Sequence, residues 1–492
     1  MTMAGLNDLT LGARPRGKTL LTAAWLVAHE DDTHVLIRNG ELVFEGNRVL
    51  YAGRRFEGEV ANRIDLGAAL ISPGLIDLDA LSDLDTYTLV TDNQPGWPRG
   101  RVWPESYVAR GPYEMYSSEE LAFQKKFAFA TLLLNGITTA LPIASLYYRE
   151  WAETTEEFGA AAEAAAALGL RVFLGPAYRS GGAIVDSTGI FHMQFDEGRG
   201  LAGLDTALDF IRRHHGTHGG LINGLLAPDR VETCTQTLLE RTMDAARELD
   251  CPVRIHMAQG KFEIDMMDRL HGATGPQWLA RHGLLNDHLI APHGTYATER
   301  DVALYAEHGV SLAHSPLVSA RMGSALKSFA SFRAAGVNIG MATDTAPADM
   351  WMNMLVGLIA CRIAEHSNAA SSADFFNAAT LGGARALRRN DLGRLSAGSL
   401  ADIAIFRLDD AHMTPTIDPI TTLLMGGNGK VTEAVFVDGH LSMRHGKVHD
   451  FDLVAAREQA QRQFEGLIAK YPERSWKHPP VEDLFRPSFP LR

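Results

Sequence analysis

The feature that most constrains this 492-residue chain is the alternation of short apolar runs with helical patterns between residues 70 and 344. Eight runs have the length and β-branched content of buried strands. They are LISPGLIDL (70–78), GITTALPI (136–143), RVFLGPAY (171–178), INGLLAPD (222–229), PVRIHMA (252–258), HLIAPHG (288–294), VSLAHSP (310–316) and VNIGMATD (337–344). Because strands that alternate with helices form parallel βα units, eight such units predict an α/β fold, a (β/α)8 barrel.

The segments on both sides of the barrel are rich in short strands. HVLIRNGELVFEGNRVLYAG (34–53) has turn signals at Asn39-Gly40 and Gly46-Asn47, and Asp438-Gly439 is a hairpin signal near the other end. The two β-rich flanks therefore predict one small sheet domain built from both chain ends. The expected divisions are residues 1–70 and 391–450 for the two halves of this domain, 71–390 for the barrel, and 451–492 for a C-terminal helix and tail.

Composition excludes several classes of partner. A formal net charge of -13 argues against nucleic acid and against an anionic membrane surface. The three cysteines are too few and too scattered for a disulfide framework, and the apolar N-terminal stretch is too short for a membrane span. We expect a cytoplasmic protein that acts on a small molecule and forms a homodimer.

Polar residues end several of the predicted strands. His256, His293, His314 and Asp344 follow four successive strands, and Asp79 follows the first. In a (β/α)8 barrel the carboxyl ends of the strands meet at one rim, which is where the active site lies. The pattern therefore predicts a functional site in which histidines and carboxylates converge.

Several motifs together resemble those of a known family. LISPGLID, LLLNGITTALPI, PVRIHMA, APHGT, ATDT and DLGRLSAGSLADIAIF occur in one order between about residues 35 and 450. They resemble the amidohydrolase superfamily, most closely its cytosine deaminase and triazine chlorohydrolase branch. The resemblance implies a metal-dependent barrel with a β-sandwich made from both chain ends. It also implies a hydrolase that acts on a carbon–nitrogen bond, or expels a comparable leaving group, in a small cyclic compound.

The resemblance assigns roles to the strand-end residues. His256 matches the metal-ligand histidine of the fifth strand, and His293 matches the sixth-strand histidine that binds metal or orients the attacking water. His314 occupies a seventh-strand position that is often histidine in this branch. Asp344 matches the eighth-strand aspartate that binds metal and takes a proton from the water. A divalent metal lowers the pKa of bound water, and a carboxylate can then accept its proton.

The sequence also departs from the family pattern. Asp79 and Leu81 stand where two first-strand histidines are normal, and Leu226 aligns with a common fourth-strand histidine. Gln259 stands where the deaminases have a glutamate that transfers protons. An amide cannot perform that transfer, so the departures predict a reshaped site.

Three interpretations of the site remain open. The first is a rebuilt mononuclear site of Asp79, His256 and Asp344 with His293 nearby, which suits zinc first and also iron or manganese. The second is a metal-free enzyme (a hydrolase, isomerase or lyase) in which the same residues act as acids and bases. Without a cation, the negative charges of neighbouring carboxylates would raise the pKa of one of these carboxyl groups. The third is a non-catalytic homologue that binds a ligand.

A long loop after the first strand supplies hints about the substrate. Residues 86–118 combine aromatic side chains with arginines, which suits a planar or partly anionic small molecule, or a neighbouring subunit. The residues expected to contact substrate are Gln259, His314, Trp97, Trp103, Arg230 and Arg321. Asp77, Asp83 and Asp85 are expected only to cap or to lie in solvated loops.

Overall fold

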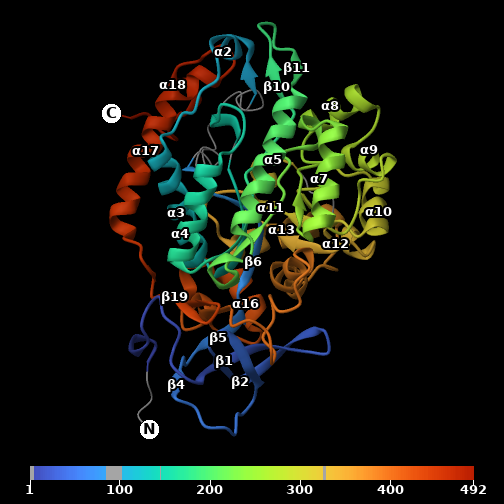
Figure 1. Ribbon diagram of the computed structural model, residues 1–492. Helices are drawn as coiled ribbons and strands as arrows, with labels where there is room; N and C mark the ends of the chain where they lie inside the picture. The colour runs from blue at the N-terminus through green and yellow to red at the C-terminus, as the bar shows by residue number, and fades with distance from the viewer. Residues whose placement is uncertain (1–4, 85–101, 145, 325–328, 492) are drawn as a thin grey trace.

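A computed structural model describes residues 5–84, 102–144, 146–324 and 329–491. A large α/β body forms one end of the molecule and a small β domain forms the other (Figure 1). Trp97 and Asp85, which the sequence singled out, lie outside the described residues.

The large body contains all eight of the predicted parallel strands. They are β6 (Leu75–Leu81), β8 (Ile137–Ile143), β9 (Arg171–Leu174), β12 (Ile222–Gly224), β13 (Val253–Arg254), β14 (Leu289–Pro292), β15 (Ser311–His314) and β16 (Ile339–Met341). They form two four-stranded sheets in the orders β12-β9-β8-β6 and β13-β14-β15-β16. A parallel bridge between Leu226 and Val253 joins the sheets on one side. On the other side Asp344 N–H donates to Asp79 O over 2.9 Å. The predicted (β/α)8 barrel is confirmed.

Apolar side chains fill the barrel interior below its rim. The inward-facing cluster includes Ile76, Leu78, Leu141, Phe173, Leu225, Ile290, Ala313 and Ala342, all nearly or fully buried. Because these side chains close the interior, the polar residues at the strand ends are left to meet at the carboxyl rim.

Helices cover the outside of the barrel. The longer ones are α3 (Ser118–Leu134), α4 (Thr155–Leu168), α5 (Glu197–His214), α7 (Gln236–Leu249), α8 (Lys261–His271), α10 (Glu299–His308) and α13 (Met350–Glu365). Their ends follow local sequence signals. The Thr154 side chain accepts the Glu157 N–H at the start of α4, and Gly169 ends that helix in the left-handed conformation (φ 72°). None of the helices in the described part of the chain is both long and apolar enough to cross a membrane.

The small domain is a nine-stranded sheet assembled from both chain ends. Its strands are β1 (Thr19–Glu30), β2 (Thr33–Glu45), β3 (Arg48–Gly53), β4 (Asn62–Asp65), β5 (Ala69–Pro73), β17 (Ile403–Arg407), β18 (Thr432–Val437), β19 (His440–Arg444) and β20 (Lys447–Val448). The antiparallel pairing of β5 with β17 joins the N-terminal half to the C-terminal half. The strands pack around a separate apolar core that includes Leu26, Phe44 and Phe436. The β-sandwich expected from both chain ends is confirmed.

A second small sheet lies beyond the carboxyl rim. β7 (Trp103–Pro104), β10 (Gly181–Val185) and β11 (Phe191–Phe195) form it, and the β10–β11 hairpin projects at the end opposite the β domain (Figure 1). This sheet places Trp103 beside Ile184, close to the barrel mouth.

The C-terminal helix α17 (Leu453–Arg474) runs along the barrel beside α3 (Figure 1). Its last residue, Arg474, is fully buried and donates to Tyr147 O over 2.6 Å and to Arg149 O over 3.3 Å. The guanidinium also lies over the Tyr107 ring at 4.9 Å. The helix is therefore anchored to the segments that surround the barrel mouth in the same chain.

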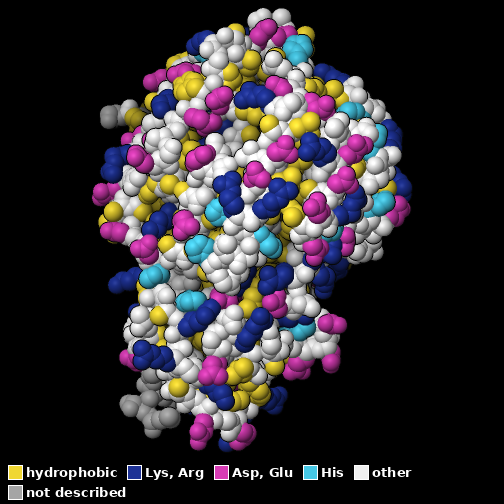
Figure 2. Space-filling model, viewed as in Figure 1, with side chains coloured by type: hydrophobic (Ala, Val, Ile, Leu, Met, Phe, Trp, Pro, Cys, Tyr) yellow, Lys and Arg dark blue, Asp and Glu magenta, His cyan; other side chains and the backbone are white. Residues whose placement is uncertain are grey.

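Two acidic residues near the first strand differ from the sequence expectation. Asp77 is buried, accepts Thr343 N–H and Thr343 Oγ1–H over 3.0 and 2.5 Å, and so ties β6 to the segment after β16. Asp83 is buried in an ion pair with Lys125 over 2.7 Å. The prediction that these two carboxylates only cap or lie in solvent is therefore wrong. Elsewhere, acidic and basic side chains are interspersed over the face shown in Figure 2.

Candidate active site

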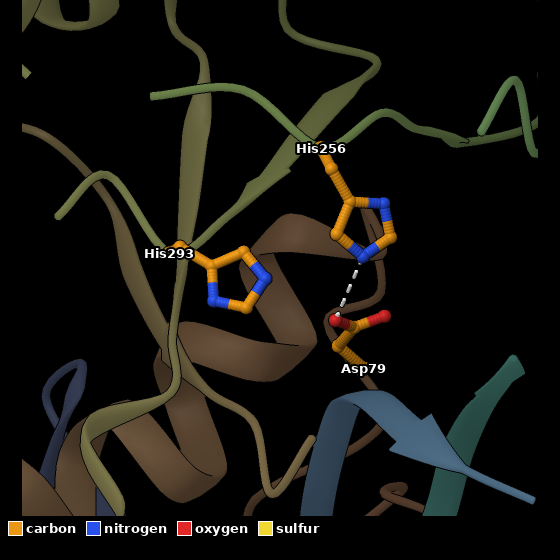
Figure 3. Close-up of side chains that lie close together, drawn as sticks. All are labelled: Asp79, His256 and His293. Atoms are coloured by element: carbon orange, nitrogen blue, oxygen red, sulfur yellow. Dashed lines mark ion pairs between the residues drawn. The ribbon is translucent and has the colours of Figure 1, made fainter. Parts of the chain in front are cut away.

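Three side chains converge at the carboxyl rim of the barrel. One possible ligand atom from each of Asp79, His256 and His293 lies within 4.8 Å of the others, and all three residues are buried. Asp79 comes from β6, while the two histidines face it from the opposite sheet (Figure 3). His256 Nε2 lies 3.3 Å from Asp79 Oδ2, and the two imidazole rings are 5.5 Å apart.

The backbone around β13 aims His256 into the barrel. Successive side chains of a strand point to opposite faces, so Arg254 and His256 share the inner face while Ile255 joins the outer core. Nδ1 of His256 lies 2.8 Å from Asp229 O. Because a carbonyl only accepts hydrogen bonds, Nδ1 carries the proton in the neutral ring, and the lone pair of Nε2 faces Asp79. Two acceptors that face each other in this way need a cation or a proton between them.

Backbone strain aims the other two polar residues. His293 and Asp344 both have positive φ, 76° and 43°, a region that costs a non-glycine residue about 1–3 kcal/mol. His293 Nε2 lies 3.5 Å from Asp344 Oδ2, so these two strand ends turn toward each other. Asp344 is next to the three-residue cluster, although it is not part of the group whose ligand atoms lie within 4.8 Å of one another.

A buried arginine completes the centre, and the sequence reasoning missed it. Arg254 Nε lies 3.3 Å from Asp79 Oδ1, and Arg254 Nη1 donates to Leu141 O over 2.8 Å. Burial raises the pKa of Asp79, but the charge of a protonated His256 and the charge of Arg254 outweigh burial and lower the pKa to about 2. Asp79 is therefore an anion in the barrel interior. The signal in the sequence was the spacing of two between Arg254 and His256, which puts both on the same face of a strand.

A cavity of about 560 Å³ opens above the centre. His256 and Asp344 line it, together with the expected substrate residues Trp103, Arg230 and Gln259. The Arg230 guanidinium donates to Gln259 Oε1, so both side chains are held at the wall. These residues therefore lie where the sequence predicted a pocket.

Arg179 is a second guanidinium in the cavity wall. It lies between two indoles, 5.2 Å from the Trp103 ring and 5.0 Å from the Trp151 ring, and its Nε donates to Trp151 O over 2.9 Å. Nη2 of Arg179 is buried and has no hydrogen-bond partner among the described residues. Planar cations and aromatic faces thus alternate along this wall.

His314 and Arg321 lie outside the lining of this cavity. Ala313 belongs to the inward cluster, so the next residue on the strand, His314, faces outward and packs against the stacked rings of Phe329 and Phe375. Burial lowers the pKa of His314 to about 3. Arg321 instead donates to Thr345 Oγ1 over 2.6 Å, in the loop after β16.

At the fourth strand end, the position that aligns with a family histidine, Leu226, does not line the cavity. Leu226 packs in the outer core, whereas Asp229 lines the cavity. Glu232 and Glu263 line the cavity too and were not among the predicted site residues. The stretch APDRVETC contains two of these carboxylates, and the charged residues just after a strand end were the signal.

Comparison with known proteins identifies the family of this chain. The sequence matches the amidohydrolase family over residues 71–441, and the chain belongs to that family. The membership confirms the predicted class, an amidohydrolase-type hydrolase.

Curated relatives and solved structures are similar along nearly the whole chain. A 5-methylthioadenosine/S-adenosylhomocysteine deaminase of Desulforudis audaxviator is 26% identical over 451 residues, which cover 90% of this chain and 96% of the relative. The structure of an adenosine deaminase from Xanthomonas campestris with bound zinc has a TM-score of 0.75 at 21% identity, and the match covers 91% of this chain and 97% of that one. A mutant of atrazine chlorohydrolase from Arthrobacter aurescens TC1, complexed with zinc and atraton, has a TM-score of 0.75 at 20% identity, with 91% and 100% covered. The predicted likeness to the chlorohydrolase-like branch is confirmed.

Proposed function

We propose that this chain hydrolyses a bond between a ring carbon and an amino group, or a comparable leaving group, in a small planar compound. The observation that carries the proposal is the buried convergence of Asp79, His256 and His293 beside Asp344, at the rim of the barrel and below the cavity. Relatives described as deaminases and as a chlorohydrolase support the same type of reaction.

The three-residue cluster fits one divalent metal. Asp79, His256 and His293 would hold it, with zinc as the first candidate because one carboxylate and two imidazoles are zinc ligands, and with iron or manganese also suited. Both carboxylate oxygens of Asp79 are buried and have no hydrogen-bond donor among the described residues. When bound, such a metal lowers the pKa of water toward neutrality.

The remaining polar groups have separate tasks in this proposal. Asp344, whose carboxylate lies 3.5 Å from His293 Nε2, accepts a proton from the attacking water. Gln259 and Arg230, paired at the wall, hold the ring by hydrogen bonds. The Asp79 carboxylate stays ionised throughout, because its pKa is far below neutrality.

The wall of the cavity favours a planar, partly anionic substrate. Trp103 offers a flat apolar face, and Arg179 and Arg230 offer guanidinium groups that bind carboxylate or carbonyl oxygens. A neutral aliphatic compound would use neither feature.

One observation favours a second candidate, a metal-independent enzyme with the same acids and bases. Arg254 already places a positive charge 3.3 Å from Asp79, which is a partial substitute for a metal cation. In this alternative His256 is protonated when it faces Asp79.

Metal analysis combined with an activity panel tests the proposal. The panel measures ammonia release from 5-methylthioadenosine, S-adenosylhomocysteine, adenosine and guanine, and chloride release from atrazine. We expect one equivalent of metal per chain and turnover of at least one compound, with both lost after chelation. Full activity in metal-free protein would contradict the metal site and support the metal-independent enzyme. No release from any compound would contradict the proposed substrate class.

The oligomeric state and the location belong to this proposal as well. A homodimer is supported by apolar side chains exposed on α13, Ile359 and Ile363, which a second copy would cover. Light scattering during size-exclusion chromatography tests it. A cytoplasmic location is supported by three buried cysteines without a disulfide.

A further inference from the structure

Two buried glutamates lie side by side in the charge network of the cavity wall. Glu232, in the turn Val231–Thr233, and Glu263, in the first turn of α8, each expose only 3% of their surface. Both line the cavity that His256 and Asp344 also line. None of the steps proposed above uses this pair of glutamates.

The hydrogen bonds show which glutamate holds the negative charge. Glu263 Oε1 accepts Ala258 N–H over 2.8 Å, and Glu263 Oε2 accepts Gln259 N–H over 2.6 Å. Backbone donors to both oxygens stabilise a carboxylate. Glu232 Oε2, in contrast, is buried without a hydrogen-bond partner among the described residues, and a buried anionic oxygen without a donor is costly.

The surroundings of Glu232 agree with this assignment. Burial and the charge of Glu263 raise its pKa to about 8, with a smaller push from Asp229, while Arg230 opposes the shift. Burial also raises the pKa of Glu263, to about 7, so the pair holds a proton near neutral pH; the two backbone donors to Glu263 favour the residence of this proton on Glu232.

We propose that Glu232 is the general acid of this site, which donates a proton to the leaving group, and that Glu263 is the positioning residue that keeps this proton on Glu232. The inference rests on the proposed hydrolysis and supplies what that reaction lacks. Gln259 cannot donate a proton as an acid does, and Glu232 borders the same cavity.

The proton balance of the step is simple. Water adds its oxygen to the ring carbon and gives one proton to Asp344. Glu232 gives its proton to the amino nitrogen, the carbon–nitrogen bond breaks, and the bonding electrons leave with ammonia. The products are the hydroxylated ring and ammonia, and Asp344 and Glu232 return to their initial states by exchanging protons with solvent.

The dependence on the leaving group tests the proposal. An amine must be protonated to depart, whereas chloride departs as an anion. Glu232→Gln should lower kcat for an amino compound that the panel identifies by about 10²–10⁴-fold, with KM nearly unchanged. For the same ring with chloride in place of the amino group, kcat should fall by less than about 5-fold. The variant removes only the proton donor, which chloride does not need. Equal losses for both leaving groups would indicate structural damage and would overturn the proposal.

Two controls and a readout without substrate complete the design. Glu240→Gln makes the same chemical change at an exposed position and should leave kcat unchanged. Glu232→Asp keeps the acid and should recover part of the loss. Infrared difference spectra between about pH 6 and about pH 10 should contain a protonated-carboxyl band that Glu232→Gln lacks. Identical spectra for the two proteins would overturn the proposal, even if no panel compound reacts. The lack of any reaction would separately contradict the proposed function.

Discussion

The two four-stranded sheets of the barrel supply different chemistry to one cavity. The sheet β13-β14-β15-β16 and the segments after its strands provide His256, His293 and Asp344. The sheet β12-β9-β8-β6 and the segments after its strands provide Asp79 together with the arginines Arg179 and Arg230. Both imidazoles thus come from one half, which also carries Asp344 and Arg254, whereas the two arginines of the cavity wall come from the other half.

The difference sets a half that carries both histidines against a half that carries the arginines and indoles of the cavity wall. The histidine-bearing half matches the motifs that the family uses for water activation. The other half has Asp79 and Leu81 in place of paired histidines, and its arginines and indoles border the space where a ring would lie. Departures from the family pattern thus occur in both halves, Asp79 and Leu81 in one and Gln259 in the other, because each strand end is an independent attachment point.

The largest expected effect concerns the histidine-bearing half. Asp344→Asn removes the proton acceptor while it keeps the side-chain shape, so kcat should fall by about 10²–10⁴-fold. Ammonia release measures the loss, and Asp268→Asn, an exposed aspartate on α8, is the control. Turnover that survives in Asp344→Asn would assign the acceptor role to another residue.

The second effect concerns the link between the two halves. Asp79→Asn leaves Arg254 buried without its counter-charge, which should lower the free energy of unfolding by about 3–5 kcal/mol. Urea denaturation measures it. The double variant with Arg254→Met should recover most of the stability, because no uncompensated charge remains. Additive losses in the double variant would show that the two side chains do not interact.

A smaller effect concerns the recognition half. Arg179→Met should raise KM for an anionic substrate about 10-fold, or about 1.4 kcal/mol, and leave kcat within about 2-fold. Arg199→Met is a matched control, since Arg199 also lies over Trp151 at 4.5 Å but is about half exposed. Similar KM changes in both variants would argue against a specific role for Arg179.

The smallest effect lies behind the rim, at His314. The folded state holds this ring neutral down to about pH 3, because burial lowers its pKa, whereas the unfolded chain binds the proton below about pH 6.5. Stability is therefore lost as the pH falls through 6.5, by about 0.8 kcal/mol between about pH 7.5 and about pH 6. His314→Phe should remove this part of the pH dependence of Tm. A variant with the wild-type pH dependence would show that His314 is not neutral in the folded protein.

Much of the fold could be predicted from periodicity. Eight apolar runs with helices between them, and two hairpin-rich flanks, correspond to the observed barrel and β domain, because both patterns are local. The convergence of Asp79, His256 and His293 followed from the rule that strand ends meet at one rim.

The remaining features depend on geometry that no local pattern specifies. The positive φ values that turn His293 and Asp344 toward each other are set by neighbouring strands. Strand alternation, applied to Ala313, would have placed His314 outside the cavity. The pairing of Glu232 with Glu263 brings the turn after β12 to the first turn of α8 through burial and charge, which sequence spacing does not reveal.

The anchoring of α17 has a consequence for the order in which the site is completed during synthesis. The cavity wall includes Tyr147, whose carbonyl accepts the Arg474 guanidinium and whose hydroxyl donates to Arg474 O. A ribosome makes the eight barrel strands more than a hundred residues before it makes Arg474. Since domains fold as they emerge, the barrel can form around an unfinished pocket, and the last helix then sets the shape that a substrate meets.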